Sequence, residues 1–321
     1  MRAMIINAFG GPDVFRLADL PAPAPGPGQL LVRLLATSVN PVDYKIRKAG
    51  GWAQVKPPAV IGYDAAGVVE AVGPGVSGFE PGAKVFYTPR IFGRPGTYAE
   101  QQVVEADIVV PKPENLTFLE AASLPLAGGT AWDMVVRLAT VKPGETVLVH
   151  AGAGGVGSLA VQLAKVSGAR VLATASERNA QLVMSLGADV VIDYRREDFA
   201  AATLRETGGQ GVEVAIDTVG GDTLARSIAA MKPYGRMVGC VSCTADLSAA
   251  LGKNLSVHFE FLERARFKME ALRTLAERRQ LVPVMDSVLP LEEVAEAHRR
   301  IEAGGMRGKI VLEVAPGARE R

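Results

Sequence analysis

The 321-residue sequence is poor in the side chains that build metal and disulfide sites, with only two cysteines and three histidines. The cysteines, Cys240 and Cys243, have the Cys-x-x-Cys spacing of half a zinc site or of a redox pair. A structural zinc ion needs four ligands, and a redox pair normally opens a helix, whereas this pair follows an apolar run. We therefore predict neither a metal site nor a redox pair there.

Long apolar runs and an excess of one charge are also absent. No stretch approaches the roughly twenty apolar residues that span a bilayer. The net charge of +1 gives no electrostatic basis for a nucleic-acid or membrane partner. Residues 1–9 favour an opening strand over a signal peptide, so we expect a cytoplasmic protein.

A strand, a glycine turn and a helix follow one another at residues 146–165. A Gly-x-Gly-x-x-Gly pattern of this kind permits a tight turn and close approach of the backbone to a pyrophosphate. Such a turn can also be a simple tight connection, but a second strand at residues 170–174 supports the dinucleotide site. The predicted contacts in the turn are Gly152, Gly154, Gly155, Val156 and Gly157.

The end of the second strand indicates which dinucleotide binds. An NAD site places an acidic side chain there for the ribose 2′-hydroxyl. This chain has Ser176 and Arg178 instead, with Glu177 as the only acid nearby in sequence. A hydroxyl and a guanidinium suit a 2′-phosphate, so we predict NADPH. The alternative for Ser176 is a helix cap, and both roles are compatible.

After the turn, short apolar runs alternate with helical segments, which predicts a doubly wound parallel sheet. A last run, residues 255–262, has the alternating pattern of an edge strand, which could pair with a second copy of the chain in a homodimer. The predicted strands are 190–193, 212–217 and 235–241, and the predicted helices are 179–186, 197–206 and 222–231.

The first part of the chain is different in kind, because short β-rich runs such as 29–35 and 66–72 are interrupted by proline and glycine. Helices are expected at 264–279 and 291–301. A late strand at 308–314 suggests that the C-terminus returns to the first domain. The predicted division is a catalytic domain at 1–122, completed by 263–321, and a dinucleotide-binding domain at 123–262.

Several further stretches are characteristic when taken together: 40–47, 62–73, 122–132, the glycine turn, 217–221 and 308–312. With them the chain resembles the medium-chain dehydrogenase/reductase superfamily, and within it the zinc-free quinone oxidoreductase branch related to zeta-crystallin. The resemblance implies an α/β protein with a GroES-like β-rich catalytic domain and a Rossmann domain, with cofactor and substrate in the cleft between them.

Zinc-bearing relatives place a cysteine, a His-Glu pair and a four-cysteine segment at positions that here hold Asn40–Asp43, Tyr63–Asp64 and residues 84–100. Without those ligands, the resemblance implies metal-free transfer of hydride from NADPH to a quinone or to the β-carbon of an α,β-unsaturated carbonyl. Asn40 and Tyr44, then Tyr63, are the predicted donors to the acceptor oxygen. Alternatively, Asn40 satisfies loop backbone and the tyrosines are ordinary half-buried aromatics.

The resemblance also assigns cofactor residues outside the turn. Thr130 is expected at the nicotinamide end and Tyr194 at the adenosine end, although Tyr194 could instead pack on a helix. Thr218 and Val241 follow strand ends, where ligands collect in such sheets. Lys309 belongs to a recurrent Gly-Lys pair near the cleft, with a solvated lysine as the alternative.

Two histidines, His150 and His258, are predicted to be core or interface residues, because neither has a carboxylate at motif spacing. Two rival functions stay open at this point. One is an enoyl-thioester reductase of the same superfamily, and the other is a non-enzymatic NADPH-binding protein.

Overall fold

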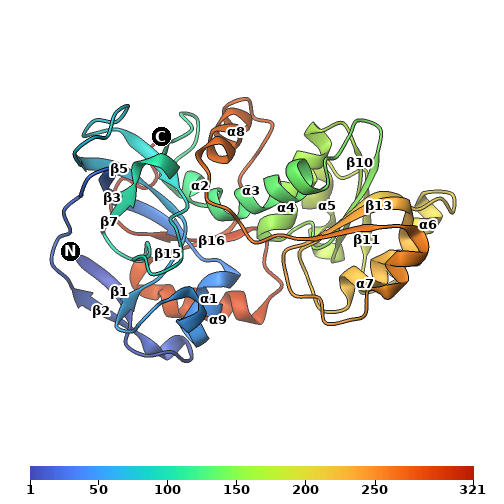
Figure 1. The fold of residues 1–321 in the computed structure, drawn as a ribbon, viewed down its shortest axis with the longest axis horizontal. Helices are drawn as coiled ribbons and strands as arrows, with labels where there is room; N and C mark the ends of the chain where they lie inside the picture. The colour runs from blue at the N-terminus through green and yellow to red at the C-terminus, as the bar shows by residue number, and fades with distance from the viewer. The chain divides into compact units, whose positions relative to one another are not determined.

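A computed structural model describes all 321 residues, which divide into two compact units (Figure 1). Unit 1 consists of Met1–Gly129, Glu263–Arg279 and Pro283–Arg321, and unit 2 consists of Thr130–Leu262 and Gln280–Val282. The chain therefore leaves unit 1, builds unit 2 and then returns. None of its helices is long and apolar enough to cross a bilayer.

Unit 1 is built mainly from strands. Seven of them form one sheet, in the order β15-β16-β3-β5-β6-β8 with β7 also paired to β3, and a smaller sheet has the order β2-β1-β4. The strands are β1 (Arg2–Ile6), β2 (Phe15–Asp19), β3 (Gln29–Ser38), β4 (Ala59–Val60), β5 (Ala65–Val72), β6 (Lys84–Tyr87), β7 (Gln101–Glu105), β8 (Val110–Pro111), β15 (Met285–Pro290) and β16 (Lys309–Glu313).

The longest of these strands, β3, organises the sheet. Its side chains at Leu30, Val32 and Leu34 are buried at alternate positions, as expected for a strand with one face on the core. It pairs with β5, β7 and β16, and the register with β16 places Val311 opposite Ser38. The late strand β16 thus belongs to the same sheet as β3.

Helices α1 and α9 contact one another in unit 1, and both lie beside the smaller sheet in Figure 1. Helix α3 contains the boundary between the two units. The helices are α1 (Pro41–Ala49), α2 (Phe118–Ala122), α3 (Pro125–Trp132), α8 (Arg266–Glu277) and α9 (Val294–Ala303), with 3-10 turns at Pro12–Val14, Gly50–Ala53, Ala106–Ile108 and Leu291–Glu293.

Unit 2 has a six-stranded parallel sheet in the order β11-β10-β9-β12-β13-β14. The order runs outward in both directions from β9, so right-handed crossovers place the helices of the two halves on opposite faces. This confirms the predicted doubly wound sheet. Its strands are β9 (Thr146–Val149), β10 (Arg170–Ala175), β11 (Val190–Asp193), β12 (Val212–Asp217), β13 (Met231–Gly239) and β14 (Ser256–Phe259).

The predicted helices of unit 2 are present with shifted bounds. The segment predicted as one helix over 222–231 is a short α-helix followed by a 3-10 turn, and the predicted strand 255–262 is shorter than expected. The helices are α4 (Gly155–Val166), α5 (Glu177–Ser185), α6 (Phe199–Glu206) and α7 (Thr223–Ser227), with a π-helix at Asp133–Leu138 and 3-10 turns at Ile228–Ala230 and Ser248–Lys253.

His150 lies in the core of unit 2, as predicted. Its Nε2 is 2.9 Å from the Ser227 hydroxyl, and its ring makes a T-shaped contact with Phe199, with the ring centres 4.6 Å apart. Burial, with a smaller contribution from the nearby Arg226 charge, lowers the pKa of His150 to about 3. The imidazole is therefore neutral in the folded protein at neutral pH.

This neutral histidine makes the fold sensitive to acid. The unfolded chain binds a proton at His150 below about pH 6.5, whereas the folded chain does so only near its lowered pKa. His150 therefore reduces the free energy of unfolding by up to about 1.4 kcal/mol per pH unit as the pH falls through this interval. We expect His150→Gln to lose less stability than the wild type between about pH 6.5 and 5. Urea unfolding at each pH measures the free energy of unfolding. Equal losses in the two proteins would contradict the lowered pKa of His150.

Candidate functional site

The glycine turn of unit 2 leads from β9 into α4. Ala151 has a φ of 53°, and the Gly152 N–H donates to the Thr174 carbonyl at 2.9 Å. A Cβ on Gly157 would lie 2.1 Å from the Ala151 carbonyl oxygen, so only glycine permits this close packing of helix on turn. The N-terminus of α4 therefore follows directly on a tight turn, as a pyrophosphate site requires.

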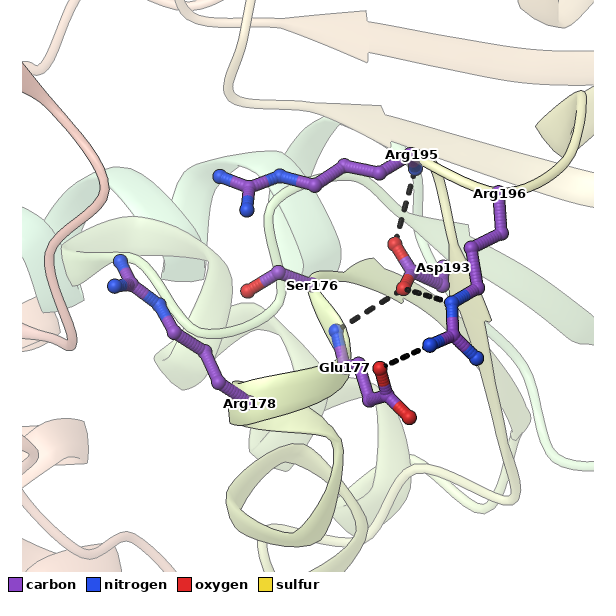
Figure 2. A pocket seen from close by; sticks show the side chains of 6 residues that line it. All are labelled: Ser176, Glu177, Arg178, Asp193, Arg195 and Arg196. Atoms are coloured by element: carbon purple, nitrogen blue, oxygen red, sulfur yellow. Dashed lines mark hydrogen bonds and ion pairs between the residues drawn. The ribbon is translucent and has the colours of Figure 1, made fainter.

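A pocket of about 260 Å³ lies where β10 and β11 end, beside the start of α5 (Figure 2). Ser176 precedes α5, yet its hydroxyl makes no hydrogen bond to the helix backbone. Figure 2 shows the guanidinium groups of Arg178 and Arg195 on the side of the pocket to which this hydroxyl points. The pocket is lined by Ser176, Glu177, Arg178, Asp193, Arg195 and Arg196.

Two acids line this pocket, not one as the sequence suggested, because β11 adds Asp193 to Glu177. The Asp193 carboxylate accepts the N–H groups of Glu177 at 3.2 Å and Arg195 at 3.0 Å. Arg196 lies 2.5 Å from the Glu177 carboxylate and 3.7 Å from that of Asp193. The two acids thus have partners of their own, and three guanidinium groups leave the pocket with one net positive charge.

The other predicted cofactor residues of unit 2 lie close to strand ends. Tyr194 follows β11, is 51% exposed and has the Arg195 guanidinium 5.8 Å from its ring centre. Thr218 follows β12 and donates to the His150 carbonyl at 2.9 Å, while Val241 follows β13. Thr130 lies in α3 and is almost fully buried. Their predicted contacts with a cofactor stay predictions.

In unit 1, Asn40 is part of a buried ionic cluster. Its Nδ2 donates to an Asp64 carboxylate oxygen at 2.7 Å, and its Oδ1 accepts from the Lys309 ammonium at 2.5 Å. Because an ammonium can only donate and a carboxylate can only accept, these two partners fix which way the amide points. Asn40 Nδ2 carries two hydrogens, and only one of them is donated to Asp64. The predicted donor is thus held in one orientation.

Asp64 and Lys309 form the ionic part of this cluster, 3.1 Å apart and almost fully buried. Asp64 also accepts from the Ser38 hydroxyl and the Leu126 N–H. Lys309 additionally donates to the Val39 carbonyl, so its three N–H groups all have partners inside unit 1. The solvated alternative for Lys309 is therefore wrong, and its predicted contact with the cofactor is not tested.

A second polar network begins at Asp43, on the first turn of α1. One Asp43 oxygen accepts the Asn40 N–H at 2.8 Å and the Tyr98 hydroxyl at 2.7 Å. The Tyr98 oxygen lies 3.1 Å from His298 Nε2, and His298 Nδ1 lies 3.2 Å from Arg47. Arg47 in turn donates to Glu302 at 2.6 Å. The network thus joins α1 to α9 through the interior of unit 1.

The two predicted tyrosine donors lie in different surroundings. Tyr44 is half-buried on α1, with the Lys48 ammonium 5.2 Å from its ring centre. Tyr63 is fully buried and its hydroxyl has no hydrogen-bond partner. Burial raises the pKa of Tyr63, so the hydroxyl keeps its proton at neutral pH. The Tyr63 hydroxyl thus keeps a hydrogen that no other group of the chain accepts.

The chain is similar over its whole length to known oxidoreductases. Residues 26–114 match the family described as alcohol dehydrogenase GroES-like domain, and residues 186–312 match the family described as zinc-binding dehydrogenase. Human quinone oxidoreductase is 35% identical over 329 residues, which cover 97% of each chain. A 2-haloacrylate reductase from a Burkholderia species is 34% identical, with 97% of this chain and 98% of that one covered.

The chain belongs to the medium-chain dehydrogenase/reductase superfamily. Within the superfamily it falls in the quinone oxidoreductase branch, as the sequence motifs indicated. A 2-methylene-furan-3-one reductase from Solanum lycopersicum is 35% identical, with 98% of this chain and 80% of that one covered.

Solved structures of the superfamily share both folds. An NAD-dependent alcohol dehydrogenase superposes with a TM-score of 0.92 at 37% identity, covering 98% of this chain and all of that one. A mycobacterial protein solved in complex with NADPH superposes with a TM-score of 0.88 at 32% identity, with the same coverage. Although one matched family is described as zinc-binding, no group of three or more His, Cys, Asp or Glu side chains in this chain could hold a metal ion.

Several residues of this superfamily member were not identified from the sequence. Arg195 and Arg196 follow Tyr194 directly, and an Arg-Arg pair at the end of the third Rossmann strand is the signal that could have identified them. His298 and Tyr98 have no such signal, because tertiary pairing alone brings α9 next to residue 98. Asp43 lies within the 40–47 stretch, but the sequence does not indicate that its side chain is buried.

Gly157 offers a direct test of the turn. In Gly157→Ala the added methyl group meets the Ala151 carbonyl, so the start of α4 must move away from the pyrophosphate site. We expect dinucleotide affinity to fall at least roughly tenfold, measured by quenching of intrinsic fluorescence or by calorimetry. Gly252→Ala is the matched control in unit 2, since a Cβ there meets nothing within 4 Å. Equal affinities in the two variants would contradict the role of Gly157.

Proposed function

We propose that the protein is an NADPH-dependent reductase that transfers hydride, without a metal ion, to quinones or small α,β-unsaturated carbonyl compounds. Its membership of the oxidoreductase family is shown by its relatives. The choice of NADPH and the class of acceptor are the parts that we infer. The observation that carries the proposal is the arginine-rich pocket at the ends of β10 and β11.

The pocket favours a phosphate over a ribose hydroxyl. An NAD site needs an acceptor for the 2′-hydroxyl, and both acids near Ser176 already accept hydrogen bonds or pair with Arg196. The guanidinium groups of Arg178 and Arg195 and the Ser176 hydroxyl are donors that suit phosphate oxygens. A mycobacterial relative binds NADPH, whereas another structural neighbour is described as NAD-dependent, so affinity for the two cofactors must be measured.

The rest of the cofactor site follows from the sheet. We infer that the pyrophosphate lies at the start of α4 over Gly152, Gly154, Gly155, Val156 and Gly157, with Tyr194 at the adenosine end. Thr130, Thr218 and Val241 are assigned to the nicotinamide end, and Lys309 to the acceptor side through Asn40. Bound NADPH supplies the hydride. The chain contributes binding, orientation and hydrogen-bond donors.

The acceptor class is inferred from the chemistry that the relatives' names describe. Quinones, 2-haloacrylates and 2-methylene-furan-3-ones all contain a carbon–carbon double bond conjugated to a carbonyl or carboxyl group. Hydride addition at carbon leaves negative charge on the conjugated oxygen, which preorganised donors can stabilise without a metal ion. Asn40, held in one orientation by Asp64 and Lys309, is the first such donor, followed by Tyr44 and Tyr63.

The proposal includes a cytoplasmic location and a homodimer. The chain has only two cysteines, a usage that fits a reducing compartment. Strand β14 lies at the edge of the unit 2 sheet, and Phe259 on it is 56% exposed. An exposed edge of this kind can pair with a second copy. Analytical ultracentrifugation of the wild type and of a variant with proline at Val257 tests the dimer, since proline removes a ladder donor.

NADPH oxidation in the presence of quinones, enones and acyl thioesters tests the function directly. We expect turnover with quinones or enones, and none with either class would refute the proposal. Faster reduction of enoyl thioesters would favour a thioester reductase of the same superfamily. Tight NADPH binding without reduction of any acceptor would favour a binding protein.

Arg178 tests the cofactor preference separately. We expect Arg178→Ala to weaken NADPH by about 1.5 to 3 kcal/mol and to leave NADH nearly unchanged, because one charge-assisted contact is lost. Arg195→Ala should act in the same direction. Arg205→Ala is the matched control, since Arg205 lies on α6 and pairs with Glu197. Titration calorimetry with both cofactors gives the result, and equal losses for NADPH and NADH would show that the pocket does not bind the 2′-phosphate.

A further inference from the structure

Asp43 is a carboxyl group with one fully bonded oxygen and one bare oxygen in the interior of unit 1. Its Oδ2 accepts both the Asn40 N–H and the Tyr98 hydroxyl, whereas its Oδ1 is buried and has no hydrogen-bond partner. The side chain is fully buried. An ionised carboxylate with a bare buried oxygen is costly, and a proton on that oxygen removes the charge.

In the chain of hydrogen bonds that runs from Arg47 to Asp43, each group donates to the next one toward Asp43. Arg47 can only donate, so it must face an acceptor at Nδ1 of His298. Burial lowers the pKa of His298 to about 3, and the neutral ring therefore carries its hydrogen on Nε2, toward Tyr98. Tyr98 then donates to Asp43. Because Oδ2 already accepts two bonds, a proton that binds Asp43 must bind Oδ1.

The charged groups around Asp43 explain why it differs from Asp64. Asp64, which precedes β5, has Lys309 of β16 and three other donors in contact, whereas Asp43 has two donors and no cation in contact. Arg47 of α1, the cation at the far end of the network, is already paired with Glu302 of α9. Burial, the largest cause, raises the pKa of Asp43 to about 7, and the Asp64 charge acts in the same direction. Burial and the Asp43 charge also raise the pKa of Tyr63.

We propose that Asp43 is a positioning residue of the acceptor site. It holds the Asn40 backbone N–H, and by taking up a proton on Oδ1 it removes a negative charge next to Asn40. This inference rests on the proposed function, in which Asn40 donates to the acceptor oxygen. Protonation changes the charge of the Asp43, Asp64 and Lys309 cluster from minus one to zero. The acceptor oxygen, on which negative charge develops, is then better stabilised.

The proton on Asp43 is not consumed. In the proposed reaction the acceptor gains a hydride from NADPH at carbon and a proton from solvent, and NADPH is oxidised to NADP⁺. The Asn40 N–H still has an oxygen to donate to when Asp43 is protonated, because the new hydrogen lies on Oδ1. Protonation therefore changes the local charge while the position of Asn40 is retained.

The pH dependence of acceptor reduction tests this. We expect kcat/KM for a neutral quinone to fall roughly tenfold more in the wild type than in Asp43→Asn between about pH 6 and 8.5. Asparagine keeps the oxygen that accepts from Asn40 and Tyr98 but cannot ionise. Reduction itself consumes a proton, so a fall shared by both proteins belongs to the reaction, and only the difference belongs to Asp43.

A second pair of variants covers the case in which Asp43→Asn does not fold. The Tyr98 hydrogen bond lowers the pKa of Asp43, so Tyr98→Phe should move the inflection of the profile to higher pH, by about one unit. Tyr87→Phe is the matched control, because Tyr87 is also fully buried in unit 1 but its hydroxyl donates to Gln102. It should leave the inflection in place. A merely structural role would lower thermal stability in both variants and shift neither profile.

The outcomes separate the two proposals. Absence of turnover with quinones and enones rejects the proposed function and this inference with it. Normal turnover, with the same pH profile in the wild type and in Asp43→Asn, rejects the inference alone. An inflection that stays in place in Tyr98→Phe also rejects it.

Discussion

The buried ion pair between Lys309 and Asp64 is the constraint on which unit 1 depends. Two opposite charges can lie in an apolar interior only if each is paired and its remaining hydrogen-bonding capacity is satisfied. Lys309 meets this condition with three acceptors, and one of them is the Asn40 side chain. Charge chemistry therefore fixes the orientation of the amide that we assign to the acceptor. Loss of either charge would leave the other buried and unpaired.

In unit 2, acidic and basic side chains also lie close together, in the pocket at the ends of β10 and β11. The pocket that we assign to a phosphate must present positive charge, although acids lie at the ends of the same strands. Backbone N–H groups and Arg196 engage Asp193 and Glu177, so the acids stabilise the start of α5, and the pocket lining still holds one more arginine than acid. In both units the acidic side chains position other groups of the chain.

The sequence predicted the parts of the structure that depend on local pattern. Strands β11 and β12 and the glycine turn follow from apolar runs and from spacing, and the bounds of both strands agree with the structure. The 222–231 segment was less predictable, because the change from α-helix to 3-10 turn depends on packing. Asp43, Tyr98 and His298 are distant in sequence and meet only through tertiary folding, so no motif could indicate that they share hydrogen bonds. Asp193 was missed for the same reason.

The pairing of β16 with β3 has a consequence for synthesis on the ribosome. Unit 2 is complete once residue 282 has emerged, whereas the sheet of unit 1 still lacks two strands, β15 and β16, at that point. Nascent β3 can already pair with β5 and β7, but its last residues, Ala36–Ser38, must wait for β16 while unit 2 can already be folded. Such long-range closure is slow, and premature termination would leave Asp64 without its counter-ion.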